Sequence, residues 1–164
     1  MNSFQLKIIA CILMAIDHVG AIMFPDIDLY RIIGRLSFPI FAFLLTEGYV
    51  HTRNLKKYFI RLFIFAIIPQ IPYSVAFGID ILNIFFTLFF GMLAILVDDK
   101  INNVYKKWGL ILGIVVISEL LHMDYGYYGI IMIFLFKKYK DNWKNLVITL
   151  ILLNISTYPI WDLQ

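Results

Sequence analysis

The sequence predicts an all-α protein, a polytopic integral membrane helix bundle with about seven transmembrane segments that form one domain over residues 1–164. Hydrophobic residues make up 62% of the chain and charged residues 15%, whereas soluble domains are about half apolar and about a quarter charged. The apolar residues recur along the whole chain, and no Pro/Gly-rich linker sets off a polar domain. The lipid bilayer is therefore an expected partner, and nucleic acid is not.

Seven apolar segments are candidates for spans, because a bilayer core of about 30 Å is crossed by roughly 20 helical residues. The sixth is short, which favours a partial or re-entrant helix. In the third, Pro69 and Pro72 remove backbone donors and predict a bend. Cys11 in the first segment is expected to be a small buried thiol. The segments are 6–24, 30–50, 57–77, 81–97, 108–122, 127–137 and 144–160.

The basic residues predict the orientation of these spans. Twelve of the fourteen Lys and Arg residues fall on one side of the predicted bundle, which the positive-inside rule places in the cytoplasm together with the N-terminus. The first segment has no small-residue cleavage site, so we expect a span and not a signal peptide. The localisation that follows is the inner or plasma membrane, with the C-terminus outside. The opposite side carries Arg31, Arg35, Asp26, Asp28, Asp80, Asp124 and Asp162.

Ionisable side chains inside the predicted spans are costly, at about 2.5–3.5 kcal/mol each, so each one needs a reason. They come in three pairs that all fall in the outward half, and one polar pocket shared by three helices would account for them. A structural ion-pair network, with the arginines satisfying the acids, is the other interpretation. The pairs are Asp17 with His18, Arg31 with Arg35, and Glu119 with His122.

His18 is the candidate catalytic base, because imidazole titrates near neutrality and accepts protons. A packed or hydrogen-bonded structural histidine remains the alternative. Glu119 and His122 have the E-x-x-H spacing of di-iron bundles, but the sequence has no second such pair. We therefore expect no metal site.

The predicted cytoplasmic edge offers cations for phosphate groups. Arg53, Lys57 and Arg61 are candidates, since guanidinium forks match phosphates, although ordinary flanking charge also explains them. Glu47 and His51 are four residues apart, and we expect them to pair with each other. On span four, a polar stripe is positioned either to donate to a ligand or to bond between helices. That stripe consists of Asn83 and Thr87.

Three stretches of the sequence resemble the TraX family of membrane acetyltransferases that act on conjugative pilin. They are LKIIACILMAIDHVGAIMF (6–24), LYRIIGRLSFPIFAFLLTEGYVHTRNLKKYFIRLFIFAIIPQIPY (29–73) and LNIFFTLFFGMLAIL (82–96). Asp17 and His18 stand at the family's D-H motif. The family's other polar positions fall on Arg31, Arg35, Glu47, His51 and Arg53. Members continue into further hydrophobic segments, so the resemblance implies either a short member of the family or one that lacks the C-terminal part.

The resemblance implies acyl transfer from acetyl-CoA, as co-substrate, to an amine or hydroxyl acceptor at the outer side of the membrane. His18 is then the base, Asp17 a positioning group, and Arg31 or Arg35 the stabiliser of the oxyanion. A pilin-like peptide, a glycan and a small amine all remain open as acceptors. A transporter of ions, protons or small molecules that uses the same polar groups is the alternative. A structural, partner-binding membrane protein is a third interpretation.

Overall fold

The computed structural model describes residues 2–78 and 80–161, the last four without their side chains. Asp162 therefore lies outside the described residues. Every regular element among them is a helix, as predicted, and one isolated parallel bridge joins Leu82 to Met123. The helices are α1 (Ser3–Met23), α2 (Asp28–Gly34), α3 (Ser37–His51), α4 (Leu55–Ile67), α5 (Gln70–Phe77), α6 (Ile84–Lys100), α7 (Val104–Leu120), α8 (Gly126–Lys138) and α9 (Trp143–Trp161).

Three helical stretches of the described chain are long and apolar enough to cross a membrane, namely Ser3–Met23, Asp28–His51 and Leu55–Phe77. A shorter apolar helix covers Trp143–Thr157. The protein is thus an all-α membrane protein with several apolar helices, and the count of seven spans stays a prediction.

Proline interrupts two of these stretches. The break between α2 and α3 falls at Arg35 and Leu36, because Pro39 cannot donate to the carbonyl of Arg35 four residues earlier. Likewise α4 ends at Ile67, and Pro69 is the N-cap of α5. The expected disruption at Pro69 is confirmed, while the break before Pro39 was not predicted.

The core lies where α3, α6 and α8 pack against one another. Phe38 of α3, Met92 and Ile95 of α6, and Ile133 of α8 are fully buried there. Gly91 lets α6 approach α8, since a Cβ atom at this position would overlap the Ile133 side chain. The helix predicted as the short sixth span is α8, which has 13 residues and sits at the centre of the bundle.

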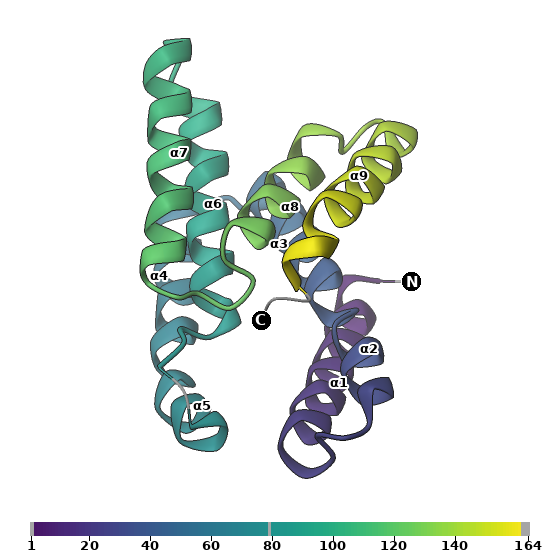
Figure 1. Cartoon of the computed structure of the whole chain (residues 1–164). Coiled ribbons are helices and arrows are strands. Elements are labelled where there is room, and N and C mark those ends of the chain that lie inside the picture. The colour runs from purple at the N-terminus through teal and green to yellow at the C-terminus, as the bar shows by residue number, and fades with distance from the viewer. Residues whose placement is uncertain (1, 79, 162–164) are drawn as a thin grey trace.

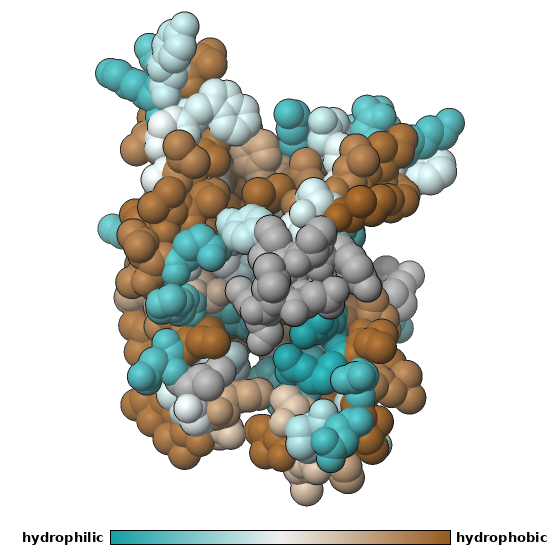
Figure 2. All heavy atoms as spheres, viewed as in Figure 1, coloured by the Kyte–Doolittle hydropathy of each residue, from teal (hydrophilic) through white to brown (hydrophobic). Residues whose placement is uncertain are grey.

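The remaining helices present large apolar side chains outward. Figure 2 shows brown side chains over the flanks of the molecule, with teal ones gathered toward the upper helix ends and around the hollow at the lower centre. Such a surface is suited to lipid contact. Cys11 lies on the exposed face of α1, so the expectation of a buried thiol is wrong. Its side of α1 faces away from α2 and α3, and only a surrounding apolar medium would cover it.

Figure 1 shows the α6–α7 and α8–α9 connections at the upper end of the bundle and the α1–α2 and α5–α6 connections at the lower end. We call the end with the α6–α7 and α8–α9 connections the basic end, because most of the lysines lie there. The end that carries the α1–α2 and α5–α6 connections holds the first candidate site, and we call it the cavity end.

Candidate functional site

A cavity of about 310 Å³ lies between α1, α3, α5, the start of α6 and the α7–α8 connection. Helix α1 contributes the two polar groups predicted from the sequence, and α5 contributes aromatic walls. The side chains that matter for its chemistry are Asp17, His18, Tyr73, Phe77, Asn83 and Asp124. Polar groups from distant parts of the chain therefore meet in one place.

The contact between α1 and α2 positions the first of these groups. Gly34 is buried against Asp17, and a Cβ atom at position 34 would overlap the Asp17 Cβ atom. This close approach allows Arg31 Nη1 to donate to Asp17 Oδ2 at 3.1 Å. This pair is the contact that the structural ion-pair interpretation expects for Asp17. Arg35, by contrast, is exposed at the C-terminal cap of α2 and does not line the cavity.

His18 lines the cavity with its ring held by aromatic neighbours. Phe77 meets it edge-on at a centroid distance of 5.1 Å, and Tyr73 lies at 6.1 Å. Nδ1 of His18 is buried and 3.7 Å from Asp17 Oδ2, too far for a hydrogen bond. Within the described residues, neither this nitrogen nor Asp17 Oδ1 has a hydrogen-bond partner. Both atoms are buried polar groups without a partner in that part of the chain, and the residues that carry them line the cavity.

The α7–α8 connection brings Asp124 to the same cavity. Its N–H donates to the carbonyl of Leu82 at 2.8 Å, and its own carbonyl accepts from the Thr87 hydroxyl. On either side of it, His122 and Tyr125 have positive φ angles of 46° and 63°, which are unfavourable for residues other than glycine. The fold thus holds this connection in one costly conformation.

Burial and, to a smaller extent, the negative charge of Asp17 raise the pKa of Asp124 from 3.8 to about 6, against the opposing charges of Arg31 and His18. In the sequence Asp124 is only a weak signal, an acid in a short connection between apolar helices. Asp124 reaches the cavity because the neighbouring Met123 pairs with Leu82, and no local sequence pattern predicts that pairing.

The predicted polar stripe serves helix contacts. Asn83 is 3% exposed, and its amide nitrogen donates to the Ala66 carbonyl and to Gln70 Oε1, both at 2.8 Å. Thr87 is fully buried and bonds to the α7–α8 connection. Asn83 also lines the cavity. Thr87 does not line it, and is connected to it only by the hydrogen bond that its hydroxyl donates to the Asp124 carbonyl.

Glu119 and His122 lie outside the cavity. The Glu119 carboxylate accepts from the N–H of Tyr127 at 2.6 Å and so caps the N-terminus of α8. His122 is exposed, and its carbonyl accepts from Leu82. In the part of the chain that the structure describes, no group of three or more His, Cys, Asp or Glu residues could hold a metal ion.

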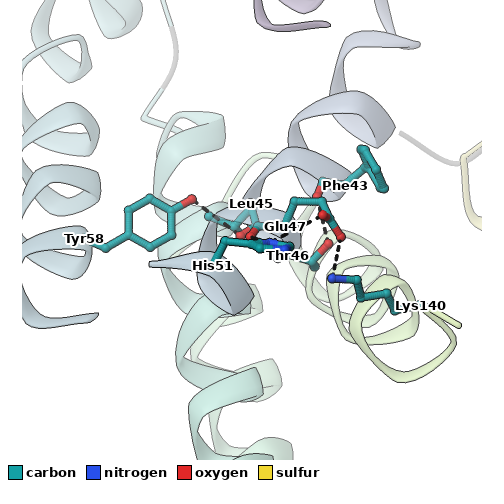
Figure 3. Close-up of polar contacts among 7 residues, drawn as sticks. All are labelled: Phe43, Leu45, Thr46, Glu47, His51, Tyr58 and Lys140. Carbon is teal, nitrogen blue, oxygen red and sulfur yellow. Dashed lines mark hydrogen bonds and ion pairs between the residues drawn. The ribbon is translucent and has the colours of Figure 1, made fainter. Parts of the chain in front are cut away.

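The basic end holds two groups of the predicted residues, the phosphate-binding candidates and the Glu47–His51 pair. Arg53, Lys57 and Arg61 line one surface pocket. Figure 3 shows the second group, in which Glu47 Oε1 lies 2.9 Å from Lys140 Nζ, and His51 Nδ1 lies 2.9 Å from the Glu47 carbonyl oxygen and 3.6 Å from Oε2. The expected pairing of Glu47 with His51 is confirmed, and neither residue lines that pocket.

The family profile described as TraX protein matches residues 3–160. The chain belongs to the TraX family. The probable fimbrial assembly protein FimC, serogroup H1, of Dichelobacter nodosus is 30% identical over 179 aligned residues, which covers 99% of this chain and 72% of that protein. Uncharacterized protein RP591 of Rickettsia prowazekii (strain Madrid E) is 38% identical over 72 residues, or 44% of this chain and 27% of that protein. No solved structure matches this TraX-family chain.

Proposed function

We propose that this TraX-family protein is a membrane-embedded acyltransferase that moves an acetyl group from acetyl-CoA to an amine or hydroxyl acceptor at the outer side of the membrane. Its N-terminus lies in the cytoplasm, and about seven spans cross the inner or plasma membrane. One observation carries the proposal: His18, whose buried Nδ1 has no hydrogen-bond partner among the described residues, lines a cavity that is also lined by Asp17 and Asp124.

His18 removes the proton from the acceptor nitrogen or oxygen, which then attacks the thioester carbonyl carbon of the donor. The new C–N or C–O bond forms, the C–S bond breaks, and CoA leaves as a thiolate that takes up a proton. The negative charge that develops on the carbonyl oxygen needs a cation. Arg31, which is ion-paired with the cavity residue Asp17, is the first candidate, and Arg35, which is exposed and outside the cavity lining, is the second.

The aromatic wall supports this chemistry by limiting water around the base. Tyr73 and Phe77 pack on the His18 ring from α5, so a bound acceptor and donor would displace most of the remaining solvent. Asp124, in the α7–α8 connection, lines the same cavity as His18. Its carboxylate is suited to orient a protonated amine.

The donor approaches from the basic end, where the summed positive charge attracts its phosphates. His18 lies 11 residues after Lys7, or about 16 Å along α1 at about 1.5 Å per residue. The pantetheine arm of acetyl-CoA is long enough for that depth. The name of the Dichelobacter relative makes a pilin-like peptide the first acceptor to test, ahead of a glycan or a small amine.

The test is an acetyl-transfer assay on the purified full chain in nanodiscs, with labelled acetyl-CoA and a peptide, a glycan and a small amine as acceptors. His18→Gln should lower the rate about 10²- to 10⁴-fold, the range for loss of a general base. His122→Gln, at an exposed position outside the cavity, is the matched control and should keep the rate. A wild-type protein that neither binds acetyl-CoA nor acetylates any acceptor would contradict the proposal.

A proton or cation carrier is the second candidate, since two carboxylates and a histidine share one cavity inside an apolar bundle. A proteoliposome flux assay distinguishes it. Flux that depends on His18 without any acetyl transfer favours the carrier, and transfer without flux favours the enzyme.

A further inference from the structure

The basic end holds a surface pocket of about 390 Å³ that we call the α4 pocket, lined by Thr52, Arg53, Asn54, Lys57, Ile60 and Arg61. We propose that the α4 pocket binds the phosphate of an anionic phospholipid from the surrounding leaflet. This inference goes beyond the proposed acyl transfer and does not depend on it. The same cations were predicted to hold donor phosphates, so the two ideas share phosphate chemistry and differ in the source of the phosphate.

The charge of the α4 pocket is unbalanced. Among the described residues, three cations line it and no acidic residue does. Elsewhere at the basic end, lysines form ion pairs with carboxylates: Lys107 lies 2.9 Å from Asp98, and Lys140 lies 2.9 Å from Glu47. A phosphate is the anion that two guanidinium forks and an ammonium group match best.

The backbone at the pocket favours an anion as well. The side chain of Asn54 caps α4 by accepting from the N–H of Lys57, and α4 begins beside the pocket with its positive dipole end. This contribution is modest alone, but it has the same sign as the three cations.

The α4 pocket is held in place by the packing of α4 on α3. The Tyr58 hydroxyl donates to the Leu45 carbonyl at 3.5 Å, as Figure 3 shows, and Gly48 leaves room for the phenol ring. The Arg61 guanidinium lies over this ring, 5.9 Å from its centroid. The ring therefore restrains one of the pocket's two arginines at the membrane-facing side of α4.

An apolar stripe below the pocket favours a lipid over a soluble phosphate compound. Ile60 lines the pocket, and Ile64, Ile68 and Ile71 continue exposed along the same side, with Ile71 76% exposed. Within α4 and its C-cap, from Ile60 to Ile68, the stripe advances 8 residues, or about 12 Å at about 1.5 Å per residue, which is most of the thickness of one leaflet's hydrocarbon. A headgroup among the cations would leave its acyl chain along this stripe.

Leu62 and Ala66, on the other side of α4, are buried against the bundle. The pocket consequently faces the surroundings and not the cavity of His18. A donor bound there would have to pass its pantetheine arm around α4, whereas a lipid meets the pocket directly. Anionic lipids gain about fivefold in affinity for each basic group they meet near the surface.

The experiment measures binding of phosphatidylglycerol to the full chain in zwitterionic nanodiscs, by native mass spectrometry and by titration. Arg53→Gln/Arg61→Gln removes two cations of the α4 pocket and should weaken binding about 25-fold, by the same factor of about five for each charge. Lys56→Gln/Lys106→Gln is the control, since it removes the same charge from the same end outside the pocket. The control should lose less than fivefold.

Equal losses in the two double variants would reduce the effect to general charge and overturn the proposal. Glycerol 3-phosphate and CoA are the competitors that identify the source of the phosphate. The lipid site predicts that neither displaces the lipid at concentrations near its own affinity, and displacement by CoA would assign the pocket to the donor instead. Acetyl transfer is measured separately, so failure of the enzyme proposal and failure of the lipid proposal give different results.

Discussion

The two ends of the bundle treat charge in opposite ways. At the basic end, lysines pair with carboxylates across helix ends, as Lys107 does with Asp98 and Lys137 with Asp99, in partly exposed positions. At the cavity end the ionisable groups are fewer and deeper, and buried polar atoms of Asp17 and His18 lack a hydrogen-bond partner in the described chain. Outside the α4 pocket, lysines of the basic end are neutralised by nearby carboxylates, whereas the cavity end leaves buried polar atoms without a hydrogen-bond partner among the described residues.

The means of placement differ too. At the basic end, flexible side chains extend to their partners. At the cavity end, the conformation and close approach of the backbone place the polar residues. Gly34 brings two helices into contact beside Asp17, and two residues with positive φ flank Asp124. Such arrangements cost free energy and persist where the rest of the fold stabilises them, which is typical of functional sites. The comparison shows that buried polar atoms without hydrogen-bond partners, held in place by the backbone, distinguish the candidate site better than the density of charged residues does.

The largest expected effect compares two asparagine caps. Asn83 caps α6 in the interior and bonds to Ala66 and Gln70, so Asn83→Ala should lower the free energy of unfolding by about 3 kcal/mol. Asn103 caps α7 at the exposed basic end, and Asn103→Ala should cost about 1 kcal/mol. Denaturant titration of both variants in detergent measures the difference, and equal losses would contradict the contrast between the ends.

The second effect is a pH dependence of stability at the cavity end. Because the folded-state pKa of Asp124 is raised to about 6 from 3.8, the folded protein holds a proton that the unfolded chain has already released between these values. Stability should therefore fall as pH rises through this window, by on the order of 2 kcal/mol. Asp124→Asn should abolish this component, and Asp80→Asn at an exposed position of the same end should not. Thermal melts between pH 4 and 7 would refute it if the wild type and Asp124→Asn change in parallel.

The third effect compares two glycines by the space around them. In Gly34→Ala the new methyl group would overlap Asp17, including its backbone, and we expect a loss of about 1–3 kcal/mol together with a weakened Arg31–Asp17 pair. At Gly113 in α7 a methyl group would meet no atom within 4 Å in the described chain, so Gly113→Ala should be neutral or stabilise the helix by up to about 1 kcal/mol. Unfolding midpoints decide between them, and a harmless Gly34→Ala would show that the two helices separate freely.

The smallest effect belongs to an ion pair of the basic end. Asp99→Asn removes the partner of Lys137, which lies 3.4 Å away in a partly exposed pair. We expect a loss of less than about 1 kcal/mol, and it should shrink further in high salt. A larger loss that survives in high salt would mean that the basic end is as tightly constructed as the cavity end.

The sequence identified part of the site for a physical reason. Asp17, His18 and Arg31 stand out because charge inside an apolar helix is costly, and the structure brings all three to one place. Glu119 satisfied the same criterion, yet it caps α8, since spacing along α7 does not reveal which side meets the α7–α8 connection. Asp124 carried almost no signal, because its position depends on the bridge that joins Met123 to Leu82, far earlier in the chain.

By itself the sequence determined the helical class, the apolar surfaces, the distribution of basic charge and the effect of Pro69, because each follows from composition or from local backbone geometry. Tertiary structure alone decided that α8 lies at the centre, that Asp17 touches Gly34 and that Asp124 lines the same cavity as His18. Those contacts join residues far apart in the chain, and their geometry depends on how close whole helices can approach. Periodicity and propensity carry no information about that distance.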